Sequence, residues 1–126
     1  MTAQSAAATI ARIESGTDGW VAIGDFVDSW DRATGAERAD LVARAPRHGD
    51  GTRRWFALVA AAVDHLARTT EADMEVPPWV VSSATVLAEP WFLLPGTALR
   101  MHQLVDTPAA FKARNIFGGD RILSRV

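Results

Sequence analysis

Three histidines are the residues of this sequence whose chemistry best suits proton transfer or metal binding, and they stand far apart in the chain. No two of His48, His65 and His102 have the HExxH or HxxxH spacing that brings two ligands to one face of a helix. Asp64 precedes His65, so Asp64, His65 and His102 could form a site only if the fold brings their segments together. We expect His65 to pack at the edge of a helix, and we expect no metal site.

Acidic and glycine-containing stretches are the next candidates for chemistry. Asp25, Asp28 and Asp31 could supply a carboxylate pair for acid–base catalysis, but they fall on the polar side of a predicted helix. We interpret them as a solvated face, with an acidic partner surface as the alternative. Gly49–Gly51 and Gly118–Asp120 match no phosphate-binding loop and predict turns, and no Gly-x-Ser-x-Gly elbow is present. We therefore expect no catalytic residues and no cofactor.

Large aromatic side chains suit protein binding better than catalysis. The sequence has five tryptophans, Trp20, Trp30, Trp55, Trp79 and Trp91. Most should lie in the core, and any tryptophan that stays exposed is the first candidate for an interface anchor. The segment between Pro90 and Pro95 is either a lid on the core or, if its rings are exposed, an interface. The predicted partner-binding residues are Trp79, Trp91, Phe92, Arg114 and Phe117.

Two other functions stay open at this point. A small-ligand sensor or enzyme would have an aromatic pocket near the central helix, lined by Trp79, Trp91, Phe92 and His102. A nucleic-acid binder would use the basic residues of the C-terminal third, which are Arg100, Lys112, Arg114, Arg121 and Arg125. We do not expect this chain alone to bind nucleic acid, because its net charge is −2 and it has no basic recognition helix.

Helices must position these side chains, and the segment from Arg53 to Arg68 predicts the strongest of them. At 100° per residue its large apolar side chains fill an arc of about 160°, and its alanines allow other helices to approach closely. We predict an all-α fold: a small helical bundle around this central helix of residues 53–68. Residues 77–96, rich in proline and tryptophan, should pack across it as irregular chain.

Capping signals divide the first half of the chain. A helix should begin at Thr17 or Asp18 and run to about residue 33. Thr34 and Glu37 fit the capping box of a short helix that ends near residue 46. The loop of residues 46–52 then leads into the central helix.

Prolines set the boundaries in the second half. Pro77 and Pro78 predict the start of an extended stretch through residues 79–81. Thr97 can open a further helix, and Pro108 predicts the first position of another.

Length and composition indicate a small soluble protein. A chain of 126 residues suits a single helical domain spanning residues 1–126, with residues 1–8 frayed because they offer little to bury. The absence of cysteine excludes disulfides, Cys-ligated zinc and thiol catalysis. No apolar run approaches the roughly 18 residues that cross a bilayer, so we expect a cytoplasmic protein with no membrane contact.

The second half also resembles a family. The residues that carry the resemblance are Trp55, His65-Leu66-Ala67, Pro78-Trp79, Glu89-Pro90-Trp91-Phe92, Leu99-Arg100, Thr107-Pro108-Ala109-Ala110-Phe111, Arg114-Asn115-Ile116-Phe117 and Leu123. Residues 53–126 thereby resemble an uncharacterised helical C-terminal domain found with Xre-type helix-turn-helix regulators and antitoxin-like proteins of high-GC Gram-positive bacteria. The resemblance assigns no site residues, and residues 1–52 contain no recognisable helix-turn-helix.

These observations lead to one expectation about function. We expect a non-enzymatic regulatory or antitoxin-like protein that acts by binding another protein. The resemblance implies a toxin-like protein or a DNA-binding subunit as the partner, and a homodimer is a further expectation.

Overall fold

The computed structural model describes residues 3–69 and 74–124, and helices account for most of their regular structure. Its α-helices are α1 (Ala6–Glu14), α2 (Gly19–Arg32), α3 (Gly35–Val42), α4 (Arg53–Thr69), α5 (Arg100–Asp106) and α6 (Ala109–Lys112). Short 3-10 helices are η1 (Asp50–Thr52), η2 (Pro78–Val81) and η3 (Ser83–Thr85), and the two strands are β1 (Trp91–Phe92) and β2 (Ile116–Phe117). The predicted all-α class is confirmed, with this two-residue strand pair as the small exception.

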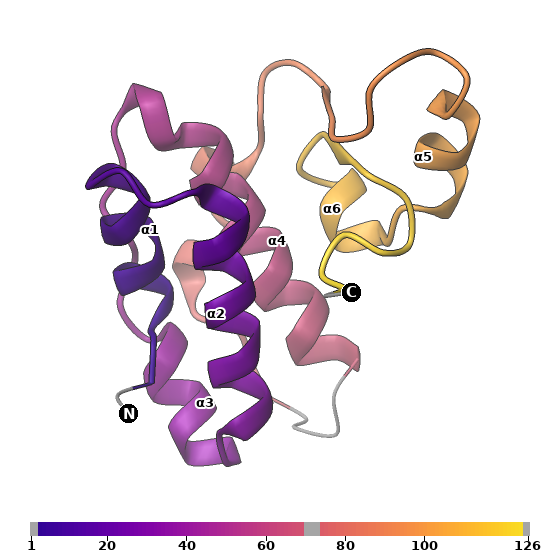
Figure 1. Ribbon diagram of the computed structural model, residues 1–126. Coiled ribbons are helices and arrows are strands. Elements are labelled where there is room, and N and C mark those ends of the chain that lie inside the picture. The colour runs from indigo at the N-terminus through magenta and orange to yellow at the C-terminus, as the bar shows by residue number, and fades with distance from the viewer. Residues whose placement is uncertain (1–2, 70–73, 125–126) are drawn as a thin grey trace.

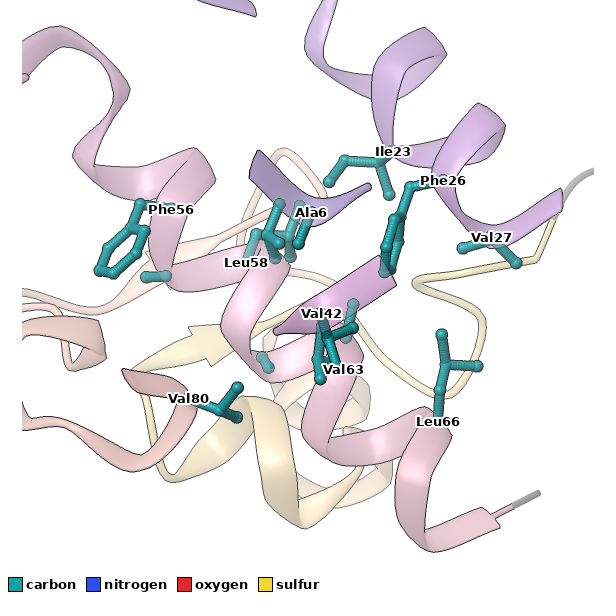
Figure 2. Packing of buried hydrophobic residues seen from close by; sticks show 14 of the residues in the cluster. Ala6, Ile23, Phe26, Val27, Val42, Phe56, Leu58, Val63, Leu66 and Val80 are labelled. Atoms are coloured by element: carbon teal, nitrogen blue, oxygen red, sulfur yellow. The ribbon is translucent and has the colours of Figure 1, made fainter. Parts of the chain in front are cut away.

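Helix α4 is the central element, as the sequence predicted. Its residues from Phe56 to Asp64 are all buried, and α1, α6, η2 and η3 pack against it. Figure 2 shows side chains of α2 and α4 meeting in the core, with Phe26 facing Leu58 and Val63. Four alanines of α4 are fully buried, and their small side chains let the neighbouring backbones approach closely: Ala57, Ala60, Ala61 and Ala62.

The predicted caps position the first helices. Asp18 caps α2, because its carboxylate accepts hydrogen bonds from the backbone N–H groups of Trp20 and Val21. Thr34 and Glu37 form the predicted capping box at the start of α3. Local sequence therefore fixes where both helices begin.

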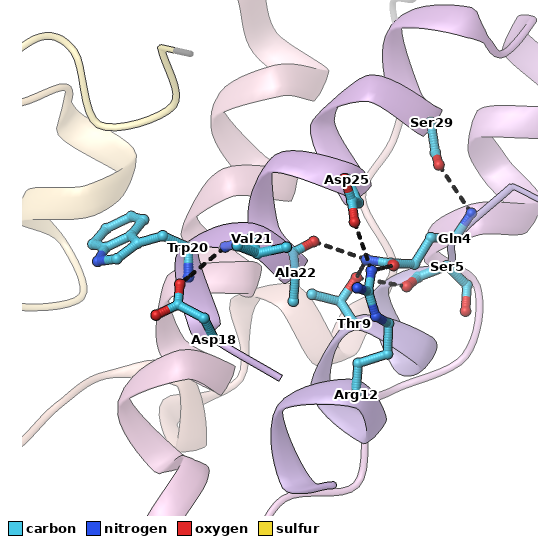
Figure 3. Close-up of polar contacts among 10 residues, drawn as sticks. All are labelled: Gln4, Ser5, Thr9, Arg12, Asp18, Trp20, Val21, Ala22, Asp25 and Ser29. Atoms are coloured by element: carbon cyan, nitrogen blue, oxygen red, sulfur yellow. Dashed lines mark hydrogen bonds and ion pairs between the residues drawn. The ribbon is translucent and has the colours of Figure 1, made fainter. Parts of the chain in front are cut away.

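The N-terminal segment differs from its prediction. Helix α1 begins at Ala6, inside the stretch expected to fray, and Ala6 is fully buried while Ser5 caps the helix. Gln4 anchors the chain to α2: its backbone N–H donates to the Ser29 hydroxyl, and its side-chain amide donates to the carbonyl of Ala22 (Figure 3). The prediction that residues 1–8 have little to bury is thus wrong for residues 4–6, while residues 1–2 lie outside the described part.

Residues 77–96 pack near α4 as predicted, but they are more regular than expected. Residues 78–81, predicted as extended chain, form the 3-10 helix η2, and Ser82 caps the following η3. Trp91 and Phe92 form strand β1, which pairs in parallel with β2 in the register Trp91 to Ile116 and Phe92 to Phe117. The strand pair satisfies backbone groups that an irregular segment would leave without partners.

The C-terminal third forms a separate layer on one side of α4. In Figure 1, α6 and the yellow C-terminal chain lie beside α4, and α5 lies beyond them at the edge of the molecule. Helix α5 begins at Arg100 rather than at Thr97, and Pro108 is the residue before α6 rather than its first position. Among the described residues, this arrangement leaves Met101 and Val105 of α5 mostly exposed.

Candidate functional site

Helix α5 is an unusual surface element, because its apolar side faces solvent and its polar side faces the protein. Met101, Leu104 and Val105 are 70%, 44% and 61% exposed. Their i, i+3, i+4 spacing places them on one side of the helix, which we call the α5 face. Leu99, just before the helix, is also exposed at 44%. A surface helix normally turns such side chains toward the core.

The opposite side of α5 is polar and faces inward. Gln103 is fully buried, and its side-chain amide accepts from the Leu94 N–H (2.9 Å) and donates to the Leu94 carbonyl (3.4 Å). One turn later the Thr107 hydroxyl donates to the Gln103 carbonyl and accepts from the N–H groups of Gly118 (3.1 Å) and Gly119 (2.8 Å). Hydrogen bonds, rather than apolar packing, therefore attach this side of α5 to the protein.

Charged groups border the α5 face. The Lys112 ammonium donates to the carbonyl of Val105 (3.0 Å), and the Arg100 guanidinium lies over the ring of Phe92 at 4.4 Å from its centroid. His102 Nδ1 lies 2.6 Å from the carboxylate of Asp106, and its Nε2 lies 3.9 Å from that of Asp120. The rim thus combines two cations with a histidine between two carboxylates.

Four of the predicted partner-binding residues, Trp79, Trp91, Phe92 and Phe117, are half-buried aromatics that pack on the protein itself. The Trp79 indole N–H donates to the carbonyl of Val42 (2.8 Å), and its ring stacks on Phe56. Trp91 packs edge-on against Trp55, and the Phe92 ring stacks on Phe117 with centroids 5.1 Å apart. Phe92 lies under Arg100 and stacks on Phe117, whereas Trp79 contacts Val42 and Phe56. The structure therefore does not gather the predicted residues into one surface.

Arg114 was predicted to contact a partner, and the structure corrects this assignment. Its side chain is only 5% exposed, and Nη1 lies 3.1 Å from the carboxylate of Asp64. The same guanidinium donates to the carbonyls of Ala110 and Val80. Arg114 is a structural residue that ties α6 and η2 to α4, because both Nη groups bind inside the protein, although its buried Nε has no hydrogen-bond partner among the described residues.

Trp20 is the exposed tryptophan that the sequence could not identify in advance. It is 43% exposed and packs edge-on against Trp55. The adjacent Val21 is 47% exposed, so the start of α2 carries a second, smaller apolar spot. Trp30, in contrast, is fully buried.

The cavities that we describe lie away from the predicted aromatic pocket. The largest, about 760 Å³, is lined by Ala7, Ala11, Glu14, Arg44, Ala45, Arg47 and His48. Three smaller ones, of about 300, 240 and 330 Å³, lie between α2 and the C-terminal segment, beside His65, and beside Arg53 and Glu89. None of these four, formed by described residues, is lined by Trp79, Trp91, Phe92 or His102.

The remaining candidates for chemistry have structural partners. His65 packs against the ring of Phe111, as expected for a histidine at a helix edge, and burial lowers its pKa. Asp25, expected on a solvated face, is half-buried and lies 2.8 Å from the guanidinium of Arg12. Asp64 binds Arg114 and Arg68, so Asp64, His65 and His102 do not form one site. Across the described residues, no group of three or more histidines and carboxylates could hold a metal ion.

The sequence predicted a helix after Thr97 but did not predict which of its sides is exposed, so the α5 face was not identified. A signal was present: Gln103 and Thr107, four residues apart, lie opposite the apolar stripe and form a polar side of their own. Which of the two sides turns inward depends on Leu94, Gly118 and Gly119, whose backbone groups the polar side binds. These residues are distant in sequence, so the helix pattern alone could not decide.

Comparisons with protein-family models, with curated proteins and with solved structures find no match to this chain. The resemblance of residues 53–126 to an antitoxin-associated domain is therefore still a prediction. None of the described helices has the length and apolar character needed to cross a bilayer.

Proposed function

We propose that this chain is a non-enzymatic regulatory or antitoxin-like protein that binds another protein through the α5 face. The observation that carries the proposal is the reversed pattern of α5: Gln103 is buried, while Met101 and Val105 are mostly exposed. Exposing apolar side chains in water has a free-energy cost of roughly 25 cal/mol per Å². A partner that covers the α5 face would recover that free energy.

Helix-in-groove recognition is the mode that best fits this geometry. In that mode an amphipathic helix inserts apolar side chains at i, i+3 and i+4 into a hydrophobic groove of the partner. Met101, Leu104 and Val105 have this spacing, and methionine adapts to irregular apolar surfaces. Because α5 lies at the edge of the molecule in Figure 1, a groove can reach its exposed side.

A different protein fits the α5 face better than a second copy of this chain. Seven residues of helix are only about 10 Å long, and two such helices side by side bury far less than the roughly 1,600 Å² of a typical stable interface. A groove covers the helix on several sides and buries more of it. The rim carries charges of both signs, Arg100 and Lys112 as well as Asp106 and Asp120, and so favours a groove with complementary charged residues at its edge. A toxin-like protein or a DNA-binding subunit, as the resemblance implies, would be such a partner.

Co-expression with the products of the flanking genes tests the proposal. A double variant, Met101→Gln with Leu104→Gln, removes the anchors and keeps good helix-forming residues. The control is Val81→Gln with Val86→Gln, which changes two exposed valines elsewhere. We expect a flanking product to co-elute with the wild type and the control in size-exclusion chromatography, and not with the α5 variant.

Two results would contradict the proposal. In the first, no flanking product co-elutes with the wild type, or one co-elutes equally well with the α5 variant. In the second, the wild type alone is a dimer that the α5 substitutions convert to a monomer, which would assign the α5 face to a second copy.

A further inference from the structure

A second surface, on the opposite side of the molecule from α5, has the features of a small-ligand site. It is the 760 Å³ cavity between α1 and the loop that follows α3. Pockets for small molecules measure about 300–1,000 Å³, and the other cavities that we describe are at or below the lower end of that range. We call this cavity the α1 groove and define it by Ala7, Ala11, Glu14, Arg44, Ala45, Arg47 and His48.

Cations of the α1 groove are free to bind a ligand. Arg44 and Arg47 line the groove and are exposed, and neither forms an ion pair with a described residue. Other arginines already have a partner within the protein: Arg12 pairs with Asp25, Arg54 lies over Trp91, and Arg114 pairs with Asp64. Two guanidinium groups on one short loop can bind a carboxylate or phosphate with paired hydrogen bonds.

The imidazole of His48 is held in place but makes no hydrogen bond with any described side chain or backbone group. Its ring stacks on Phe56 with centroids 3.9 Å apart and planes only 9° from parallel. Phe56 is buried in the core, so the stacking fixes the orientation of the imidazole. A fixed, half-buried ring at the wall of a cavity, attracted by the Glu14 carboxylate but without a hydrogen bond to a described residue, is suited to bind a polar ligand atom.

Glu14 fixes the loop that carries these groups. Its Oε1 accepts hydrogen bonds from the Thr52 hydroxyl (2.5 Å) and from the backbone N–H of Gly49 (3.1 Å). These bonds connect α1 to the end of the loop and keep the groove open at that position. The Glu14 carboxylate also repels anions, so an anionic group is directed toward Arg44 and Arg47.

Three alanines form an apolar part of the groove lining. Ala7 and Ala11 are four residues apart on α1, so their methyl groups lie on one face, and Ala45 adds a third methyl from the loop. Small side chains leave room for an apolar body of a ligand in the same groove that Arg44 and Arg47 line. The groove therefore fits a molecule with an acidic head and a hydrocarbon part better than a bare inorganic ion.

From these observations we infer that the α1 groove binds a small organic anion, in which a carboxylate or phosphate meets Arg44, Arg47 and His48 and an apolar group lies on the three alanines. This inference goes beyond the proposed protein binding at the α5 face and does not depend on it. It places a ligand site in a cavity that is not lined by Trp79, Trp91, Phe92 or His102, the residues near which the sequence suggested a pocket.

Titration of ¹⁵N-labelled protein with four probes tests the inference: phenylacetate, phenyl phosphate, inorganic phosphate and benzylamine. We expect phenylacetate, phenyl phosphate or both to cause saturable shifts in the amide signals of residues 7–14 and 44–48. Which of the two binds decides between a carboxylate and a phosphate ligand. Inorganic phosphate should bind more weakly because it lacks the apolar part, and benzylamine should not bind because its charge is positive.

Matched variants locate the binding site. Arg44→Gln with Arg47→Gln should weaken binding of the better probe by about tenfold or more, because charge-assisted hydrogen bonds are lost. Arg121→Gln, another exposed arginine, and the Met101→Gln, Leu104→Gln variant should leave it unchanged. Unperturbed spectra of the free variants show that they are folded.

Three outcomes overturn the inference. They are the absence of saturable shifts with both organic anions, equal binding of benzylamine, and an equal loss of affinity in Arg121→Gln. None of them bears on partner binding at the α5 face, so the two proposals fail separately.

Discussion

Arg114 and Asp64 form an ion pair in the interior of the protein, although fifty positions separate them in the chain. Asp64 lies in the second half of α4, and Arg114 lies two residues after the end of α6. The Arg114 guanidinium also donates to the carbonyl of Val80 in η2. One side chain thus joins the central helix to both parts of the second half. Helix α5 precedes α6 in the chain and strand β2 follows it. The Arg114–Asp64 ion pair therefore positions the layer that presents the α5 face.

Removing Arg114 should destabilise the protein strongly. Arg114→Met leaves the Asp64 carboxylate without its buried partner and removes the donor that binds the carbonyls of Ala110 and Val80. Breaking a buried pair from one side typically costs about 3–5 kcal/mol, and we expect a loss of that size in the free energy of unfolding measured with urea. Arg68→Met, which removes the exposed partner of the same carboxylate, is the control and should cost much less. Equal losses would show that Arg114 has no special structural role.

Truncating the centre of α4 should show where the core lies. Leu58 is fully buried and faces the side chains of α2 in Figure 2, so Leu58→Ala leaves a cavity and should lower the free energy of unfolding by about 2–5 kcal/mol. Val81→Ala shortens a valine that is 62% exposed and should change it by no more than about 0.5 kcal/mol. Similar effects of the two substitutions in the same urea titration would contradict the burial described for α4.

Attachment of α5 through Gln103 can be measured at a single amide. Gln103→Leu has a similar size but cannot accept the hydrogen bond of the Leu94 N–H, so the Leu94 amide should exchange with solvent roughly tenfold to a hundredfold faster. The neighbouring Leu93 N–H binds the carbonyl of Phe117 and is the internal control. If the Leu94 amide exchanges at its original rate, Gln103 does not hold α5 to the protein.

The helical fold could be predicted from sequence wherever local patterns decide it. The apolar arc of residues 53–68 identified α4, and the capping residues Asp18 and Thr34 identified the starts of α2 and α3, because these signals act over a few neighbouring residues. Pairing of Trp91–Phe92 with Ile116–Phe117 was not predicted, since a two-residue strand has no periodicity of its own. Its position depends on contacts between segments 25 residues apart.

The candidate sites were harder to predict because exposure is a property of the whole fold. Arg114 appeared to be a surface cation, and only the position of Asp64 one layer away shows that it is buried. Arg44 and Arg47 were given no role, and His48 was considered only as a histidine without ligand spacing; the α1 groove appears only when α1 packs beside that loop. Residue types identify the chemistry that is available, but distant contacts decide which groups are free to use it.

Acid should weaken the fold through His65. Burial lowers the pKa of His65 below its ordinary value of 6.5. The charge of the nearby Asp64 acts in the opposite direction, but its effect on the pKa is smaller. Between that lowered value and 6.5 the unfolded chain binds a proton that the folded protein does not, so the free energy of unfolding decreases as the pH falls below about 6.5. We expect wild type to lose more stability than His65→Gln between pH 7.5 and pH 5.5 in urea titrations. Parallel losses in the two proteins would exclude His65 as the cause.

The hydroxyl of Thr52 should control the acidity of Glu14 at the edge of the α1 groove. The Thr52 hydroxyl and the Gly49 N–H both donate to this carboxylate and lower the pKa of Glu14 below its ordinary value of 4.5, with the hydroxyl the larger cause. Thr52→Val keeps the shape of the side chain and removes the O–H donor, so the pKa of Glu14 should rise toward 4.5 while the Gly49 N–H keeps it somewhat lower. Glu37, whose pKa is lowered by Thr34, is the internal control in the same NMR titration and should not change.

Because the native protein holds Glu14 ionised, its contribution to stability is present above pH 4.5 and is lost as the pH falls through the lowered pKa, and the variant should lose less. An unchanged pKa of Glu14 in the variant would mean that Thr52 does not hold the carboxylate, and that the groove depends on the Gly49 N–H alone.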